Sequence, residues 1–189
     1  MTSHYVDITI VPDAETSAPV LMGVLFDKLH RALVRLQLDS LGVSFPQYSV
    51  TPRHIGRTLR LHASEAVLHD FLSCDWLHGL RDHVRITPVE PVPAHAVHCN
   101  IRRHQFKSSV NRMRRRRMSR KGESAKQSAL AIPDGSSDLS SYPFVHLHSL
   151  STRQPFCFYF AMSRPQAEPV SGSFNSYGLG LQGATIPWF

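Results

Sequence analysis

The sequence predicts an α+β fold in which two groups of short strands and helices follow one another along 189 residues. Three observations predict it: short runs of alternating apolar residues, stretches of apolar residues at helical spacing, and a proline-rich segment at 88–93 between them. A chain of this length buries roughly two-thirds of its unfolded surface, so its fold requires no disulfide or metal. We expect two domains, residues 1–92 and 93–189.

The first half contains four expected strands and two expected helices. Val6, Ile8 and Ile10 alternate with polar residues, which predicts a strand over 5–11 with one buried face. Leucines three or four residues apart predict a helix over 19–38. Ser64 followed by Glu65 predicts the start of a second helix. Further strands are expected over 42–45, 58–63 and 84–89. The order β-α-β-β-α-β is that of a ferredoxin-like domain.

The second half is interpreted as another α+β domain, a divergent form of the same ferredoxin-like fold. Its expected elements are a strand over 94–105, an arginine-rich helix over 108–121, and apolar strands over 144–150 and 156–162. Residues 122–141 are rich in Ser and Gly and predict a mobile loop. A glycine-rich tail ends the chain.

The positive charge of the protein is concentrated in one segment. The formal net charge is +7 and the isoelectric point is near 9.8. Ten of the 21 basic residues lie between Arg102 and Lys121, and no acidic residue occurs between Glu90 and Glu123. The rest of the chain, with 11 basic and 14 acidic residues, is slightly acidic. A local positive field of this kind is typical of a protein that binds a polyanion.

The arginine-rich segment is expected to bind nucleic acid as a helix. The arginines that share one side of that helix are Arg112, Arg115, Arg116 and Arg120. A solvated charge run or a disordered basic arm is the alternative. Against it, the segment is internal and its charge comes almost wholly from arginine, whose planar guanidinium suits phosphates and guanine edges. A membrane surface is not expected, because no apolar face accompanies the charge.

Among the twelve histidines, His30 has the position of a catalytic base. It lies at the edge of the apolar stripe of the first helix, where an imidazole is half exposed, and imidazoles titrate near neutral pH. An ordinary surface histidine is the alternative. Two histidine-rich groups, around His98 and His146, lack a second half at zinc spacing, and no set of converging carboxylates is evident. We therefore expect no metal and no other cofactor.

Two further patterns limit the interpretation. The run Gly178 to Gly183 matches a dinucleotide-binding motif, but too few residues follow it for the helix and acid that this motif needs. Close approach to an RNA backbone is the expected use of these glycines. Three widely spaced cysteines (Cys74, Cys99 and Cys157), with no apparent signal or membrane span, indicate a reducing compartment such as the cytoplasm.

Several short motifs, in this order and spacing, resemble the type I-F CRISPR repeat-processing endoribonucleases of the Csy family along the whole chain. The motifs are LFDKLH at 25–30, GVSFP at 42–46, Arg103 with Gln105, the group Ser149, Ser151, Thr152, Gln154 and Phe156, Tyr177-Gly178-Leu179, and Pro187-Trp188-Phe189. The resemblance implies a ferredoxin-like N-terminal domain and a C-terminal domain whose arginine helix docks along a repeat hairpin.

The resemblance also implies the reaction and the residues that perform it. His30 would be the catalytic histidine, Ser149 would hold the ribose whose 2′-hydroxyl attacks, and Tyr177 would orient the histidine. Cleavage at the 3′ base of the hairpin would leave a 2′,3′-cyclic phosphate and a 5′-hydroxyl without a metal. The implied RNA-binding residues are Arg103, Gln105, Lys107, Arg112, Arg115, Arg116, Arg120, Ser151, Thr152 and Phe156.

Family members keep the cut CRISPR RNA and join a multisubunit surveillance complex, so this RNA and the other type I-F subunits are the expected partners. Two alternatives stay open. The chain is a hairpin-binding subunit that has lost cleavage, or an unrelated basic protein such as a ribosome-associated factor. The arginine helix alone does not separate these functions.

Overall fold

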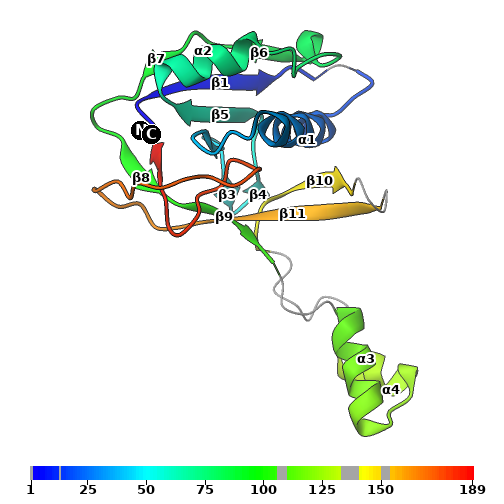
Figure 1. Cartoon of the computed structure of the whole chain (residues 1–189). Helices are drawn as coiled ribbons and strands as arrows, with labels where there is room; N and C mark the ends of the chain where they lie inside the picture. Colours follow the sequence, from blue (N-terminus) through cyan, green and yellow to red (C-terminus); the bar gives the residue numbers. More distant parts are fainter. Residues whose placement is uncertain (1, 13, 106–109, 133–140, 150–153) are drawn as a thin grey trace.

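The computed structural model describes residues 2–12, 14–105, 110–132, 141–149 and 154–189. It is an α+β structure with antiparallel sheets (Figure 1). The elements up to residue 91 are β1 (His4–Ile10), α1 (Ala18–Leu36), β2 (Gly42–Ser44), β3 (Ser49–Val50), β4 (Arg53–His54), β5 (Thr58–Ala63), α2 (Glu65–Ser73), the 3-10 helix η1 (Arg81–His83), β6 (Val84–Ile86) and β7 (Glu90–Pro91). Those that follow are β8 (Val97–Cys99), β9 (Ile101–His104), α3 (Val110–Lys121), α4 (Ala125–Ala131), β10 (Phe144–His148), β11 (Pro155–Met162) and β12 (Ile186–Trp188).

The first sheet has the strand order β2-β5-β1-β6, with antiparallel neighbours, and β7 also pairs with β1. Its register pairs Val6 with Leu61 and Ile8 with Leu59, so one face is apolar. The predicted strand over 58–63 and the predicted N-cap at Ser64 are confirmed. The strand expected over 84–89 ends at Ile86, ahead of Pro88, because proline cannot donate to a strand ladder.

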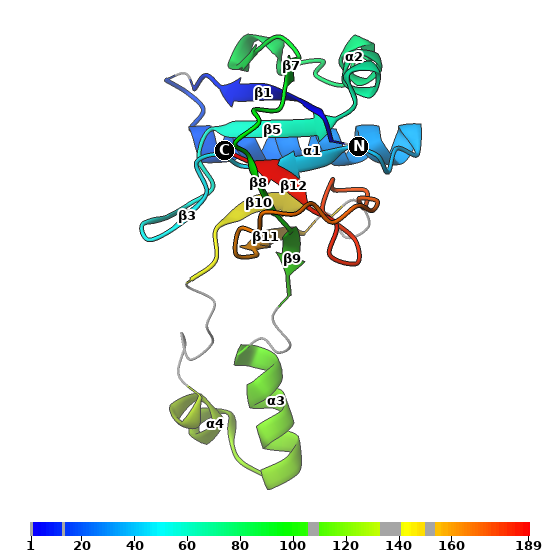
Figure 2. The ribbon, with the colours of Figure 1, turned by 90° about the vertical axis from the view of Figure 1, so that its left-hand side faces the viewer.

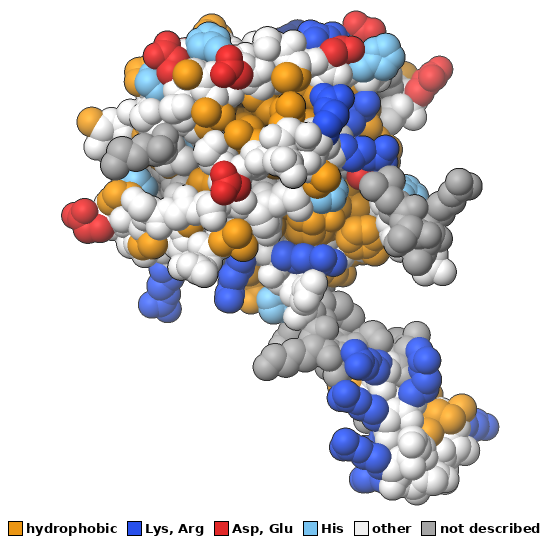
Figure 3. All heavy atoms as spheres, viewed as in Figure 1, with side chains coloured by type: hydrophobic (Ala, Val, Ile, Leu, Met, Phe, Trp, Pro, Cys, Tyr) orange, Lys and Arg blue, Asp and Glu red, His pale blue; other side chains and the backbone are white. Residues whose placement is uncertain are grey.

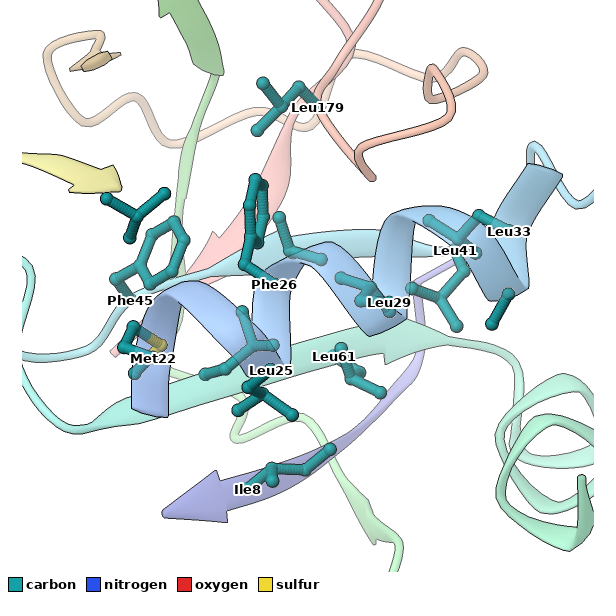
Figure 4. Packing of buried hydrophobic residues seen from close by; sticks show 14 of the residues in the cluster. Ile8, Met22, Leu25, Phe26, Leu29, Leu33, Leu41, Phe45, Leu61 and Leu179 are labelled. Carbon is teal, nitrogen blue, oxygen red and sulfur yellow. The ribbon is translucent and has the colours of Figure 1, made fainter. Parts of the chain in front are cut away.

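Helix α1 lies between the first sheet and the sheet formed by β9, β10 and β11 (Figure 1). Ile8 and Leu61 pack on one side of it and Leu179 lies on the other (Figure 4). Eight of its residues are therefore buried, a wider apolar sector than a helix with one covered face needs. At Gly23 the helix touches β10 so closely that a Cβ atom would collide with the carbonyl oxygen of His146.

The strand expected over 94–105 is two strands in different sheets. β8 pairs with β12, and β9 joins the sheet of order β10-β11-β9. Asn100 separates them, because its backbone N–H donates to Ser163 Oγ (2.9 Å) and its side chain donates to the carbonyl of Ala184 (2.7 Å). The prediction of one continuous strand was wrong because apolar alternation does not show a change of partner.

The mobile loop expected over 122–141 contains helix α4. Ser124 Oγ accepts from the backbone N–H of Gln127, and the side chain of Gln127 accepts from the backbone N–H of Ser124. This reciprocal capping box starts the helix, so the prediction was wrong for residues 125–131. Residues 133–140 lie outside the described part of the chain. The expected end of the arginine helix at Gly122 is confirmed, with a φ of 64° at that glycine.

The C-terminal residue closes over the face of the first sheet that α1 does not cover. Arg60 binds Asp7 through two hydrogen bonds (2.7 and 2.8 Å) and donates to the carbonyl of Phe189 (3.2 Å). The guanidinium also lies over the rings of Tyr5 and Phe189, at 4.6 and 4.0 Å from their centroids. A buried guanidinium requires such partners, so the chain terminus is part of the folded unit.

His62 lies on the same face and is wholly buried. Its Nε2 is 2.8 Å from Ser44 Oγ, and Nδ1 has no hydrogen-bond partner among the described residues. Burial, together with the nearby charge of Arg60, lowers the pKa of His62 to about 3. The imidazole is therefore neutral in the folded protein at ordinary pH.

The free energy of unfolding is expected to fall as the pH drops below about 6.5, the ordinary pKa of histidine. Folded His62 resists protonation down to about pH 3, so the unfolded state binds one more proton in this window and each pH unit removes about 1.4 kcal/mol. Denaturant unfolding at pH 7 to 4 measures the slope. His62→Gln, whose amide can bond Ser44 without titrating, should have a shallower slope. Equal slopes would exclude His62 as the source.

Candidate active site and nucleic-acid interface

His30 is fixed by a backbone carbonyl from the distant C-terminal segment. Its Nδ1 lies 2.7 Å from the carbonyl oxygen of Ser176, which can only accept a hydrogen bond. Nδ1 therefore carries the proton, and in the neutral ring Nε2 keeps its lone pair. The side chain is half-buried at the edge of α1, as the apolar spacing predicted. The ring is thus held as the tautomer that can act as a base through Nε2.

Tyr177 stacks on the imidazole of His30. The two ring centroids are 3.8 Å apart and the planes are nearly parallel, at 4°. Tyr177 in turn contacts Phe158, with a centroid distance of 4.7 Å, and Phe26 at 5.8 Å. Burial raises the pKa of the Tyr177 phenol, although the charge of Arg103 opposes the shift. The phenol is therefore neutral near pH 7, and the ring supports His30 from one side.

Asn175 organises the turn that presents both Ser176 and Tyr177. Its side-chain oxygen accepts from the backbone N–H groups of Tyr177 (2.8 Å) and Leu179 (3.1 Å). Gly178 follows with a φ of 71°, and its carbonyl accepts from the N–H of Val43 on β2. The sequence analysis did not identify Asn175, although asparagine ahead of a glycine turn is a known signal.

The glycines of the segment 178–183 pack against protein atoms. A Cβ at Gly178 would lie 2.6 Å from Val43 Cγ1, and one at Gly180 would meet the carbonyl of Ala184. The expected close approach to RNA is not needed to explain either glycine. No helix follows in the described residues 184–189, which agrees with rejecting a dinucleotide motif.

Arg103 and Phe156 are joined to His30 through the aromatic cluster. The guanidinium of Arg103 lies 4.7 Å from the Phe158 centroid and 5.7 Å from that of Phe156. Arg103 is exposed on β9, opposite Phe160 of β11. The structure therefore connects His30, Tyr177, Arg103 and Phe156, four predicted site residues, into one cluster of contacts around the buried ring of Phe158, and the exposed parts of these residues are called the site surface below.

Ser149 and Gln105 lie at the ends of strands that border the site surface. The N–H of Ser149 donates to the carbonyl of Gln154 (2.9 Å), which extends the β10–β11 hairpin beyond the pair Leu147–Phe156. Because side chains alternate along a strand, Ser149 belongs to the face of Leu147 and Phe156, about 7 Å further along. Gln105 follows β9 and is exposed. Lys107, Ser151 and Thr152 lie outside the described residues.

The arginines of α3 divide into two groups with different partners. Arg114 donates twice to the carbonyl of Ile132 (2.9 and 2.6 Å), and Arg117 binds Glu123 (2.5 Å). These two side chains hold α3 to α4 and to the turn between them. Arg112, Arg115 and Arg116 instead line an open hollow with Ser119, as their helical spacing predicted. Arg120 is exposed in the last turn.

Basic side chains are concentrated on one part of the surface. In Figure 3, Lys and Arg side chains gather on α3 and along the lower side of the body toward it, whereas basic and acidic side chains are mixed over the rest of the body. Figure 2 shows α3 and α4 projecting together from the sheets. Within the described ranges, no group of three His, Cys, Asp or Glu residues could hold a metal ion, and none of the helices combines the length and apolar character needed to cross a membrane.

These features define a class of protein: a basic α+β protein with a carbonyl-bound, aromatic-stacked histidine beside an exposed arginine, and an arginine-rich helical hairpin. The chain belongs to the family described as "CRISPR-associated protein (Cas_Csy4)", whose profile matches residues 5–189.

Two curated relatives cover almost the whole chain, and both are named CRISPR-associated endonuclease Cas6/Csy4. The protein from Pseudomonas aeruginosa (strain UCBPP-PA14) is 40% identical over 186 residues, which are 98% of this chain and 99% of the relative. The one from Escherichia coli (strain UTI89 / UPEC) is 37% identical over 186 residues, with the same coverage.

Arg114→Ala is expected to loosen the α3–α4 pair, because two hydrogen bonds to the carbonyl of Ile132 are lost. The expected cost is about 1–2 kcal/mol of local stability. Amide hydrogen exchange across residues 112–132 measures it. Arg115→Ala, which removes the same charge from the exposed side of the same helix, is the matched control and should exchange as wild type. Equal exchange in the two variants would contradict the division of the arginines.

Proposed function

We propose that the protein is an endonuclease that processes CRISPR repeat RNA, binding a repeat hairpin and cutting at its 3′ base. Membership of the Cas_Csy4 family and the two relatives named as endonucleases support this function. The single structural observation that carries it is the hydrogen bond between His30 Nδ1 and the Ser176 carbonyl, which leaves Nε2 available as a base.

The proposed reaction uses the RNA's own 2′-hydroxyl as nucleophile and involves no metal. His30 Nε2 takes the hydroxyl proton, and the 2′-oxygen attacks the adjacent phosphorus. The bond from phosphorus to the 5′-oxygen of the next nucleotide then breaks, and that oxygen takes up a proton. The products are a 2′,3′-cyclic phosphate and a 5′-hydroxyl. General base catalysis of this kind contributes about 10²–10⁴-fold.

The remaining members of the surface receive roles from their chemistry and position. Ser149 would hold the attacking ribose through its hydroxyl. Phe156, half-buried beside Arg103, would stack below the last base pair, a contact worth about 1–3 kcal/mol. Arg103 and Gln105 would read base edges at the foot of the stem. Tyr177 would keep the imidazole plane aligned with the 2′-hydroxyl.

Helix α3 would bind the phosphates of the hairpin through the face formed by Arg112, Arg115, Arg116 and Arg120. Planar guanidinium groups form paired hydrogen bonds with phosphate oxygens. Arg114 and Arg117 would support this face from behind, as their contacts with Ile132 and Glu123 suggest. Lys107, Ser151 and Thr152, outside the described residues, are assigned further RNA contacts.

We also propose a ferredoxin-like arrangement for residues 1–92 and an RNA-binding domain over 93–189 that packs against it. The element order β1-α1-β2-β5-α2-β6 and the sheet order β2-β5-β1-β6 support the first assignment. The strands of residues 97–188 pair only among themselves in the described ladders, which supports the second. After cleavage the protein would keep its RNA and join other subunits of a type I-F surveillance complex.

Wild-type protein is expected to cut a repeat hairpin in EDTA, and His30→Ala should cut about 10²–10⁴-fold more slowly while binding equally well, because only the base is removed. Single-turnover cleavage and equilibrium binding are measured on the same RNA. A hairpin with deoxyribose at the cut site should bind and stay intact. Cleavage of that substrate would contradict 2′-hydroxyl attack. Hairpin binding without cleavage by wild type would indicate a subunit that only captures RNA.

Arg115→Ala/Arg116→Ala is expected to weaken hairpin binding and to reduce the magnitude of the slope of log K against log salt by about 2, one for each lost phosphate contact. Affinities measured from 50 to 400 mM salt give the slope. Arg85→Ala, an exposed arginine on β6, is the control and should keep the wild-type slope. An unaltered slope in the double variant would exclude phosphate contact by this face.

A further inference from the structure

A pocket of about 560 Å³ lies where the start of α1, the β3–β4 hairpin and β10 meet. None of the described residues that are assigned to cleavage or hairpin binding lines it. Its volume falls within the range of about 300–1,000 Å³ that is usual for sites that hold small organic molecules.

The floor of the pocket is apolar and aromatic. Ile55 and Val145 are buried, at 6% and 2% exposure, and both line it. Phe144 forms one wall, packed against Tyr159 at a centroid distance of 5.3 Å and edge-on to His146 at 5.0 Å. The guanidinium of Arg53 lies 4.9 Å from the Phe144 centroid. Aromatic rings and guanidinium planes are the groups on which unpaired bases stack.

The rim of the pocket is basic. Arg53, His54, Arg57 and His146 line it, and the described lining includes no acidic side chain. The backbone at Arg57 is held in place, because its N–H donates to Gln47 Oε1 (2.6 Å) and its carbonyl accepts from the N–H of Ile10 (2.8 Å). A rim of two guanidinium groups and two imidazoles favours an anion, above all a phosphate.

We propose that this pocket binds one nucleotide of the single-stranded RNA that flanks the repeat hairpin, with its base on the apolar floor and its phosphate beside Arg53 and Arg57. The inference rests on the proposed function, in which the hairpin is bound near Ser149. Strand β10, an edge strand of its sheet, links the two sites: Phe144 and Ser149 lie about 17 Å apart along an extended chain and on opposite faces of it, so the RNA would pass around this edge. A short run of unpaired nucleotides bridges such a distance. An acidic peptide matches the charge but not the flat aromatic wall.

The test compares three non-cleavable RNAs with deoxyribose at the cut site: the hairpin alone, the hairpin with six unpaired nucleotides on its 5′ flank, and the hairpin with six unpaired nucleotides on its 3′ flank. Wild-type protein is expected to bind one of the extended RNAs about ten-fold more tightly than the hairpin, the gain from one stacked base. Arg53→Glu/Arg57→Glu should bind the extended RNA no more tightly than the hairpin. Its affinity should therefore fall more for the extended RNA than for the hairpin alone. Arg85→Glu/Arg164→Glu changes the net charge equally and should weaken the binding of the hairpin and of the extended RNAs by the same factor. Thermal unfolding verifies that the variants are folded.

Photo-crosslinking gives an independent readout. A 4-thiouridine placed in the flank that increases the affinity should crosslink to the peptide that contains Phe144 and His146. Extended RNAs that bind no more tightly than the hairpin, or crosslinks only elsewhere, overturn the inference while leaving hairpin binding intact. Absence of hairpin binding by wild type would instead contradict the proposed function itself. A synthetic peptide of alternating Asp and Phe tests the other occupant. If the peptide binds, its binding requires Arg53 and Arg57, and the RNA flank adds no affinity, then the pocket serves a protein partner and the inference fails.

Discussion

The double packing of helix α1 is the constraint on which the candidate site depends. The helix carries His30, and it is held between the first sheet and the sheet of β9, β10 and β11 (Figures 1 and 4). Phe26 faces the second sheet, with ring contacts to Phe158 and Phe160 at 5.6 and 5.3 Å. The Gly23 contact with His146 fixes the depth at which the helix lies. Because protein cores are close-packed, a shift of α1 would move His30 relative to every other member of the site.

Two separate parts of the chain meet at the imidazole, and a third is joined to it through the ring of Phe158. His30 comes from α1, the carbonyl of Ser176 and the ring of Tyr177 come from a turn near the C-terminus, and Arg103 comes from β9. Asn175 and Gly178 shape the turn, and Phe189 at the end of the chain anchors this segment to Arg60 on the first sheet. The chemistry assigned to His30 therefore depends on contacts spread over nearly the whole sequence. A hydrogen bond to one ring nitrogen determines which nitrogen acts.

The arginine-rich helix shows how one residue type serves two purposes. Side chains that reach a carbonyl or a carboxylate, as in Arg114 and Arg117, stabilise the helical hairpin itself. Side chains on the opposite side, around the hollow of Arg112, Arg115 and Arg116, carry the charge outward. The repulsion among adjacent arginines is thereby reduced within the protein before any RNA binds.

Local patterns in the sequence were sufficient for the elements whose residues interact with near neighbours. Alternation predicted β1 and β5, helical spacing predicted α1 and placed His30 at its edge, and the charge count located α3. The same patterns missed the break at Asn100, the helix α4 and the β3–β4 hairpin. The first two follow from hydrogen bonds of individual side chains that periodicity does not register.

The sequence by itself determined the fold class, the family, and the residue types available for acid–base chemistry and phosphate binding. Only the tertiary structure decided that Ser176 binds His30 Nδ1, that Tyr177 stacks on the imidazole, and that Arg53, Arg57 and Phe144 enclose a pocket. The physical reason is that each of these contacts joins residues far apart in the chain. Several are made by backbone atoms or ring faces. The position of these groups depends on the packing of whole elements, so residue identity alone does not give it.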